Sequence, residues 1–506
     1  HHPPMEVSMR STFFHSLRRN QDMLAESLNL DQNDDIVTRS FTALGRSCAL
    51  YFVEGMASGQ RMSDSVLRPL LRAQEELSGR QALEAVTRRL IEAPEVKTEK
   101  QPYAAVQQLM RGQTLVLIDT VDEAVLVDLR GYIRRPVSIP QTENVVIGPH
   151  EAFTEPLRDN LTLLHRMLPT PRLICKLGQV GTRISTQTAV CYLEGICPQE
   201  TVDEVQRRLE ASAIDHVLTV GELSQLIEDD PYAPLPQMVG TERPDRAVSF
   251  LMEGQAVLLL DGSPRALALP VSLWHLFHAP DDSYMRWQYG TFMRLLRLFG
   301  ALVTLLLPAV FVSLVVYHPI TIPMTLLTSI MQSRTNVPIN LFEETLLMVA
   351  VFALINESAI RIPGMMGSSL GLVSTLILGT AAVDAGLVSP LLIIVVALSG
   401  LGSYAMPNYP LSFAFRMGQV VLLLAAGITG IAGLCYAVVM LLCWVAAMES
   451  LGQPFLAPGS PRRTHNPDLL FRAPTFRQRL RAYLSNPEEM KRAYGRMRRF
   501  DGRNKE

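Results

Sequence analysis

The chain has 506 residues, of which 48% are hydrophobic, with 46 Lys and Arg against 48 Asp and Glu. Its mean hydropathy is slightly positive, which is unusual for a soluble protein of this size. Only seven charged residues lie between Leu298 and Met448: Arg334, Glu343, Glu344, Glu357, Arg361, Asp384 and Arg416. This uneven distribution excludes a wholly soluble protein, a disordered chain and a disulfide scaffold, and it predicts a soluble module followed by a membrane module.

The soluble part of the chain is predicted to begin with a flexible N-terminal segment, residues 1–33. The segment also lacks the apolar run of a signal peptide. We therefore expect the large N-terminal part of the chain to remain in the cytoplasm.

Two sequence patterns recur at nearly the same spacing. The segment Ala49–Gly55 is typical of a short buried strand ended by glycine, and Ala189–Gly195 repeats it at an offset of 140 in the numbering. Gly112–Asp119 and Gly254–Asp261 match at an offset of 142. Matched features at one offset indicate an internal repeat. We predict two similar α/β subdomains, residues 34–147 and residues 148–290, whose shared cleft could hold a small ligand or whose surfaces could serve assembly.

Motifs for catalysis or metal binding are missing from the sequence. It contains no P-loop, no G-x-S-x-G and no H-E-x-x-H. The cysteines form no C-x-x-C pair and have no histidine at zinc-finger spacing; they are Cys48, Cys175, Cys191, Cys197, Cys435 and Cys443. We interpret these cysteines and the isolated His150, His165 and His216 as packing or surface residues. The sequence thus predicts no enzyme, no cofactor and no metal site.

Residues 291–456 are predicted to form a helical membrane domain. Leu298–Tyr317 is an uncharged run of 20 residues, long enough to cross about 30 Å of hydrocarbon. Gly364–Val383 and Leu387–Ala405 are further candidate spans. Met417–Met448 is too long for one span, so we expect two helices that break near residues 427–433.

The number of spans and the position of the tail depend on charge. Leu341–Ile360 is less apolar and is expected to lie shallow or re-entrant, which leaves four to six spans, with four preferred. After Pro461 the chain has 13 Lys and Arg against 5 Asp and Glu. Positive charge marks the cytoplasmic side, so residues 457–506 are predicted to be a basic helical tail in the cytoplasm. That tail would either contact anionic lipid headgroups or be solvated.

Acidic residues within the membrane domain are candidates for a pore or gate. Glu343 and Glu357 are separated by about four helical turns, which returns to nearly the same helical face. An ionisable group in a span costs about 2.5–3.5 kcal/mol and usually faces protein or water, so acidic rings could line a pore in an oligomer. Alternatively, Glu357 pairs with Arg361, and Glu343 and Glu344 are helix N-terminal charges. Asp384 is a further candidate that also suits an interfacial turn.

Small residues predict close helix packing in the same domain. Gly364, Gly367, Gly371 and Gly379 recur along one segment, and Gly400, Gly402 and Ser403 lie in the next. Such residues allow helices to approach closely. Pro407–Pro410 then breaks the chain. We therefore expect a packed helical bundle rather than a simple anchor.

Several motifs in one order resemble a known family. They are Gly148–Glu155 (GPHEAFTE), Thr241–Arg246 (TERPDR), Ala385–Pro390 (AGLVSP), Pro407–Tyr409 (PNY) and Leu451–Pro458 (LGQPFLAP). On these residues the chain, from about Asp34 to Pro461, resembles the A subunits of GerA-type spore germinant receptors. It departs from the family after Val180-Gly181, where Ser185 and Gln187 replace a common Lys and Asp while Arg183 matches.

The resemblance implies a function in spore germination. It implies a multi-pass protein of the spore inner membrane that acts with a transporter-like B subunit and a lipoprotein C subunit, and not with nucleic acid. A homo-oligomer that releases monovalent cations when a nutrient is sensed would fit. The alternatives are a paralogue like the stage V sporulation AF protein that modulates ion release, and a non-conducting scaffold for the B subunit. Candidate subunit-interface residues are Glu242, Arg243, Asp245, Arg246 and Arg183.

Overall fold

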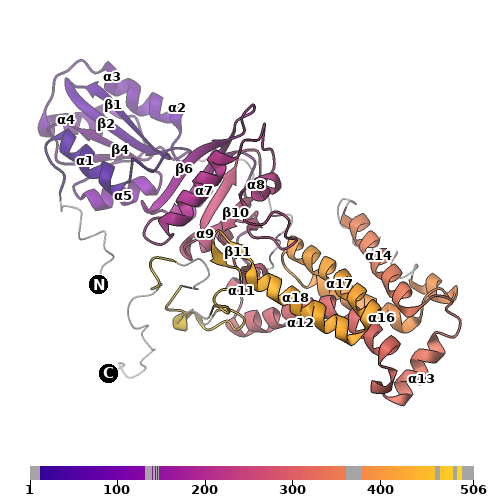
Figure 1. Ribbon diagram of the computed structural model, residues 1–506. Helices are drawn as coiled ribbons and strands as arrows, with labels where there is room; N and C mark the ends of the chain where they lie inside the picture. Colours follow the sequence, from indigo (N-terminus) through magenta and orange to yellow (C-terminus); the bar gives the residue numbers. More distant parts are fainter. Residues whose placement is uncertain are drawn as a thin grey trace, which may run out of the picture.

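The computed structural model describes residues 12–131, 140, 143, 145, 147–360, 379–461, 468–481 and 487–492. Two α/β subdomains are followed by a group of long helices, and the three parts lie in a row (Figure 1). Described pieces of the C-terminal tail return to the second subdomain. The predicted order of α/β units followed by helices is confirmed.

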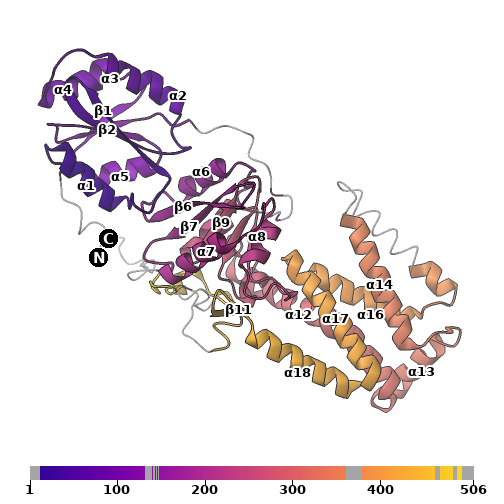
Figure 2. The ribbon, with the colours of Figure 1, turned by 45° about the horizontal axis from the view of Figure 1, so that its top comes forward.

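The first subdomain is an antiparallel sheet with strand order β1-β2-β4-β5-β3. Helices α1 and α5 lie on one face of the sheet, and the short helices α2, η1, α3, α4 and η2 lie on the other (Figure 2). The elements are α1 (Leu17–Ser27), β1 (Ile36–Ala43), β2 (Arg46–Val53), α2 (Gly59–Met62), η1 (Ser63–Leu67), α3 (Arg68–Arg72), α4 (Gly79–Ala85), η2 (Val86–Leu90), β3 (Val96–Glu99), α5 (Pro102–Met110), β4 (Thr114–Ile118) and β5 (Ala124–Val127).

The second subdomain repeats this arrangement with strand order β6-β7-β9-β10-β8. Strand β9 is fully buried and wholly apolar, and β7 is buried from Thr188 onward, where its sequence becomes apolar. The elements are α6 (Leu157–Met167), β6 (Leu173–Val180), β7 (Thr186–Leu193), α7 (Gln199–Ala211), α8 (Val220–Ile227), β8 (Val239–Thr241), α9 (Pro244–Met252), β9 (Ala256–Leu260), β10 (Ala266–Leu269), α10 (Leu273–Phe277) and α11 (Asp281–Tyr284).

Helix α1 corrects the prediction that residues 1–33 are flexible. The amide of Leu17 donates to Asp119 Oδ1 at 3.0 Å, and the amide of Leu157 at the start of α6 donates to Asp261 Oδ1 at 2.9 Å. Leu17 and Leu24 are buried against the sheet. Residues 17–27 are therefore the first helix of the repeat, and their order follows from burial of one apolar face.

The helical part begins with α12 (Trp287–Val312), which continues through η3 (Ser313–Tyr317). Helices α13 (Met324–Ser333), α14 (Leu341–Ile360), α16 (Pro390–Tyr404), α17 (Tyr409–Thr429) and α18 (Ile431–Ala447) follow. The predicted break near residues 427–433 is confirmed. Helix α17 ends at Thr429, and Gly430 separates it from α18 with a φ of +68°, a backbone conformation that residues with a side chain rarely adopt. The expected start at Met417 was wrong, since α17 already begins at Tyr409.

Two of the described helices are long and apolar enough to cross a membrane: Trp287–Tyr317 and Tyr409–Thr429. Helices α16 and α18 are apolar but shorter. Most of the predicted span Gly364–Val383 lies outside the described residues. A count of four to six spans therefore stays a prediction.

The described part of the tail differs from the expected basic helix. Residues 468–481 and 487–492 contain only the short 3-10 turn η5 (Thr475–Arg477). Arg492 forms an ion pair with Glu253 at 2.9 Å, and the amide of Glu488 donates to the carbonyl of Ile196. The tail here binds the second subdomain, because its arginines find carboxylates and carbonyls on that surface.

Candidate functional site at the junction of subdomain, first membrane helix and tail

A buried ion-pair cluster joins the second subdomain to α12. Arg294 and Arg297 lie three residues apart and therefore project from one face of the helix. Arg297 Nη1 lies 2.7 Å from Asp282 Oδ2, and Arg294 Nε lies 3.2 Å from the same oxygen. Arg294 Nη1 also reaches Asp468 Oδ1 in the tail at 2.7 Å. This cluster holds α11, α12 and the tail together at the edge of the membrane domain.

Asp282 is the centre of the cluster, with 1% of its surface exposed. Burial alone would raise the pKa of its carboxyl, but hydrogen bonds and charges from Arg297 and Arg294 outweigh burial and lower the pKa. The carboxyl is thus ionised at neutral pH. Arg472 donates to the carbonyls of Asp282, Ser283 and Met285, which satisfies the C-terminal end of α11.

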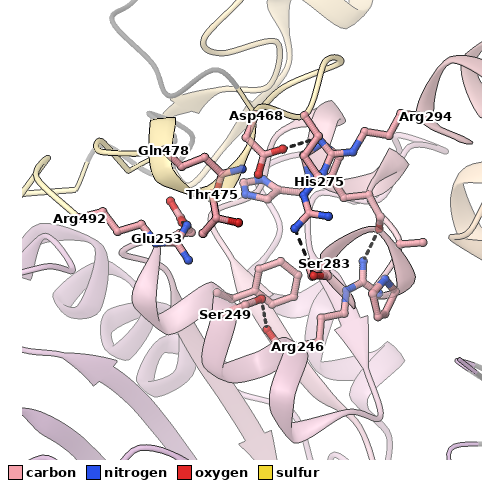
Figure 3. A pocket seen from close by; sticks show the side chains of 15 residues that line it. Arg246, Ser249, Glu253, His275, Ser283, Arg294, Asp468, Thr475, Gln478 and Arg492 are labelled. Atoms are coloured by element: carbon pink, nitrogen blue, oxygen red, sulfur yellow. Dashed lines mark hydrogen bonds and ion pairs between the residues drawn. The ribbon is translucent and has the colours of Figure 1, made fainter. Parts of the chain in front are cut away.

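A polar cavity of about 320 Å³ opens beside this cluster (Figure 3). Its lining combines four arginines, two carboxylates and two histidines, which come from α9, from α10 and the residue after it, from α12 and from the tail. They are Arg246, Arg294, Arg472, Arg492, Glu253, Asp468, His275 and His278. Such a cavity suits water or a small polar solute. The cavity thus lies where the second subdomain, α12 and the tail meet.

His275 is buried and His278 is half-buried, and both are held in their neutral form. Burial, and then the charge of Arg294, lower the pKa of His278 to about 3. Burial, and then its neighbour His278, lower the pKa of His275 well below its usual value. His278 Nε2 lies 2.8 Å from the carbonyl oxygen of Leu469, so this nitrogen carries the proton and donates to the tail. This hydrogen bond alone would favour the protonated ring, but burial and the charge of Arg294 outweigh it and keep His278 neutral.

Acid is expected to weaken this junction. In the unfolded chain His278 has a pKa of about 6.5, whereas the folded value is about 3. The folded pKa is the lower one, so this stability is complete above about pH 6.5 and is lost as pH falls toward 3. Between pH 7 and pH 5 we expect a loss of about 2 kcal/mol from this residue. Thermal unfolding at both pH values measures it.

His278→Gln is the matched variant, because its amide can still donate to Leu469 but cannot titrate. Its unfolding should depend less steeply on pH than that of the native chain. The exposed His216→Gln is the control and should keep the native slope. Equal slopes for all three proteins would show that His278 does not titrate on unfolding.

The two arginines of the motif Thr241–Arg246 are buried within the single chain. Arg243 is fully buried and donates to both carboxylate oxygens of Asp245, at 3.1 and 2.9 Å, and to the carbonyl of Pro149 at 3.0 Å. Arg246 pairs with Glu143 at 2.5 Å and donates to the carbonyl of His278. These arginines fix the segment that enters the second subdomain. Their burial leaves little of either side chain for a partner, and a role at a subunit interface stays a prediction.

The remaining interface candidates are more accessible. Glu242 lies beside Arg265, with 3.8 Å between Oε1 and Nε. Asp245 also accepts from the hydroxyl of Tyr284. Arg183 is 80% exposed and lies 3.5 Å from the exposed Asp215. Of the five predicted residues, Arg183 is therefore the one best placed to reach a partner, and a role for it stays a prediction.

The acidic pore candidates separate into two groups. Glu344 is fully buried on α14, where Oε1 accepts from the amide of Ser389 at 2.6 Å and Oε2 lies 3.3 Å from Arg334 Nε. This residue fixes the start of α16. Glu343 and Glu357 are exposed on α14, and Asp384 is exposed in the turn before Gly386. The suggested partner of Glu357, Arg361, lies outside the described residues.

A second cavity, of about 530 Å³, lies where the second subdomain meets the turn between α16 and α17. Pro407–Pro410 form one side and α8 forms the other. Asn408 Oδ1 caps α17 by accepting from the amide of Leu411 at 3.1 Å. The predicted break in the chain is therefore also a contact between the soluble and helical parts.

Comparisons with known proteins place this chain among spore germination proteins. The family model described as Bacillus/Clostridium GerA spore germination protein matches residues 23–483. Spore germination protein GerLA of Bacillus cereus is 32% identical over 90% of this chain and 92% of its own length. Stage V sporulation protein AF of Bacillus subtilis (strain 168) is 28% identical over 88% of this chain and 89% of its own length.

One solved structure is also similar to this chain. The N-terminal domain of the A subunit of the Bacillus megaterium spore germinant receptor GerK3 is 26% identical. The alignment covers 52% of this chain and 97% of that domain, with a TM-score of 0.42. The family model spans more than half of the chain, and the identity to GerLA extends over nine-tenths of it. The chain belongs to the GerA family of spore germination proteins.

Proposed function

We propose that this chain is the A subunit of a nutrient germinant receptor in the spore inner membrane, and that copies of it assemble into a cation-release channel. Its membership of a spore germination family supports the general role. The exposed acidic face of α14 carries the channel proposal. In this view the ion-pair cluster at Asp282 transmits movement of the soluble part to α12.

The spacing of the two exposed glutamates along α14 supports the channel proposal. Glu343 and Glu357 lie about 21 Å apart along the helix axis at the usual rise per residue, whereas the hydrocarbon layer is about 30 Å thick. Two charges at that spacing cannot both leave the layer if the helix spans it. A lipid-facing carboxylate costs about 2.5–3.5 kcal/mol. Both side chains are exposed in the single chain, so we infer that other subunits enclose them around water.

The partners follow from the family. A transporter-like B subunit and a lipoprotein C subunit would complete the receptor, with both ends of this chain in the cytoplasm. A paralogue that modulates ion release is the second candidate, because the stage V relative also aligns over most of the chain. Germination of spores that lack this chain separates the two. Loss of the response to one nutrient class favours the receptor, and slower release with every nutrient favours the modulator.

The channel proposal is tested in spores that carry Glu343→Gln together with Glu357→Gln at a matched protein level. Removing two charges from the ion path should slow germinant-triggered potassium release about tenfold or more. The loss of about 1.4 kcal/mol of attraction between one carboxylate and the passing cation already changes a rate tenfold. Asp64→Asn, at an exposed carboxylate of the first subdomain, is the control and should release potassium normally. Normal release from the double variant would assign the pore to other segments and favour the scaffold.

A further inference from the structure

A cluster of metal-binding side chains lies buried between the two α/β subdomains. His165 Nε2 lies 2.9 Å from Asp35 Oδ2 and 3.9 Å from Cys175 Sγ, and the three ligand atoms lie within 4.8 Å of one another. None of the three residues exposes more than 1% of its surface. From sequence, His165 and Cys175 were interpreted as separate packing residues, and the fold brings them together.

The cluster bridges the subdomains because Asp35 belongs to the first and the other two belong to the second. Residues just before β1 lie along the free edge of β6: the amide of Asp34 donates to the carbonyl of Cys175, and Asn33 Nδ2 donates to the carbonyl of Leu173. A ligand held by all three side chains would therefore join the two units.

Hydrogen bonding leaves the cluster incomplete. Asp35 Oδ1 and His165 Nδ1 are buried and have no hydrogen-bond partner in the described structure. The nearest cation to Asp35 Oδ1 is Arg158 Nη1 at 3.8 Å, and that guanidinium makes its shorter contact, 2.8 Å, with Glu54. A buried carboxylate oxygen without a partner is costly. A cation would satisfy it.

We propose that Asp35, His165 and Cys175 bind a structural Zn²⁺ ion that clamps the two subdomains together. Imidazole nitrogen, thiolate sulfur and carboxylate oxygen are the ligands that zinc prefers. Ligand atoms around a tetrahedral zinc are about 3.4–3.6 Å apart, given bonds of about 2.0–2.3 Å. The separations here require side-chain shifts of about an ångström. Binding of the thiolate releases the proton of Cys175 to solvent.

A cysteine on the neighbouring strand lies outside this group of three and would supply a fourth ligand after a side-chain shift. Cys191 in β7 is the cross-strand partner of Cys175, is fully buried, and its thiol interacts with that of Cys175. The backbone amide and carbonyl of Cys175 bond to Asn33 and Asp34 on the other side, so the cysteines form a non-hydrogen-bonded pair whose side chains are close. A closed site with four protein ligands is typical of structural zinc.

The test uses the full-length protein, purified in detergent with a reducing agent and a tag that contains no histidine. It is equilibrated with ZnSO₄ and then dialysed against a weak chelator. We expect one zinc per chain, and a thiolate-to-metal charge-transfer band when Co²⁺ replaces it. Cys175→Ser and Asp35→Asn should lower zinc affinity at least tenfold. Cys48→Ser, at a buried cysteine of the first subdomain that is outside the cluster, should bind zinc like the native chain.

Each outcome decides the proposal. Zinc that is lost from the Cys175 and Asp35 variants, while both keep the native circular dichroism spectrum, supports it. Absence of zinc from the native protein overturns it. So does equal zinc in the native and Asp35→Asn proteins, because the metal would then be bound elsewhere, for example by the terminal His1-His2 pair.

Discussion

Asp282→Asn is expected to destabilise the full-length protein by about 3–5 kcal/mol, the usual cost of removing one partner from a buried ion pair. The substitution keeps the shape of the side chain but removes the charge between Arg294 and Arg297, which are 4% and 7% exposed. Arg294 would keep the carboxylate of Asp468, whereas Arg297 would keep, among the described residues, only neutral acceptors: the amide oxygen introduced at residue 282 and the carbonyl of Phe277, at 3.3 Å. An arginine that is buried without a carboxylate is the source of the loss.

Thermal unfolding in detergent, followed by tryptophan fluorescence, measures the effect. Asp64→Asn is the control: it removes an exposed pair with Arg68 and should change stability by about 0.5 kcal/mol or less. Adding Arg297→Met to Asp282→Asn should restore part of the loss, because the uncompensated charge is then removed as well. If Asp282→Asn unfolds like Asp64→Asn, the cluster does not hold α12 to the soluble part.

The repeat shows which part of the fold was accessible from sequence. Offsets of 140 and 142 between strand patterns predicted two subdomains, and the two sheets have the same strand order. Helix α1 was missed because only the strands were compared. The residue pattern at the start of α1 recurs at the same offset of 140: Phe13, Leu17 and Asn20 match Phe153, Leu157 and Asn160. Asn20 and Asn160 each bond to a backbone amide and carbonyl six residues earlier, which explains that match.

Charge was a weaker guide inside the helical part. The predicted segment began at Met417, directly after Arg416, yet Arg416 lies within α17 and donates to Ser403 Oγ on α16 at 3.0 and 3.2 Å. A charge is tolerated inside a bundle when another helix supplies its partner. This partner lies beyond the turn at Pro407–Pro410, and only the packing of α16 against α17 brings it near. No local pattern could have shown this.

The candidate site was hardest to predict for the same reason. In the sequence, Arg294 and Arg297 stand just before the apolar run Leu298–Tyr317, but nothing near them identifies the carboxylates with which they pair. Asp468 is 174 residues from Arg294. The motif at Arg243 was identified as functional, but whether it faces inward or outward depends on the segment around Glu143 and Pro149. Residue types were thus predictable, whereas their partners required the tertiary fold.

Gly402→Ala is expected to separate α12 from α16 and to cost about 3 kcal/mol or more. A Cβ atom at residue 402 would lie 2.4 Å from the carbonyl oxygen of Gly300 and 2.7 Å from Thr304 Oγ1, both on α12. Neither backbone can yield without moving its helix. Overpacking of this kind costs about 1–3 kcal/mol. The helices also exchange two hydrogen bonds, Thr304 Oγ1 to the carbonyl of Ser399 and Ser399 Oγ to that of Thr304, each contributing about 0.5–1.5 kcal/mol.

Gly379→Ala is the matched control, because among the described residues a Cβ there would meet only Ile393 Cγ2, at 4.0 Å. In a helix with free space, replacing glycine by alanine stabilises by up to about 1 kcal/mol. The same substitution should therefore change the free energy of unfolding in opposite directions at the two positions. Denaturant titration in detergent measures both. Stabilisation by Gly402→Ala would mean that α12 and α16 are farther apart in the membrane than here, and that the small-residue pattern serves another contact, such as one between subunits.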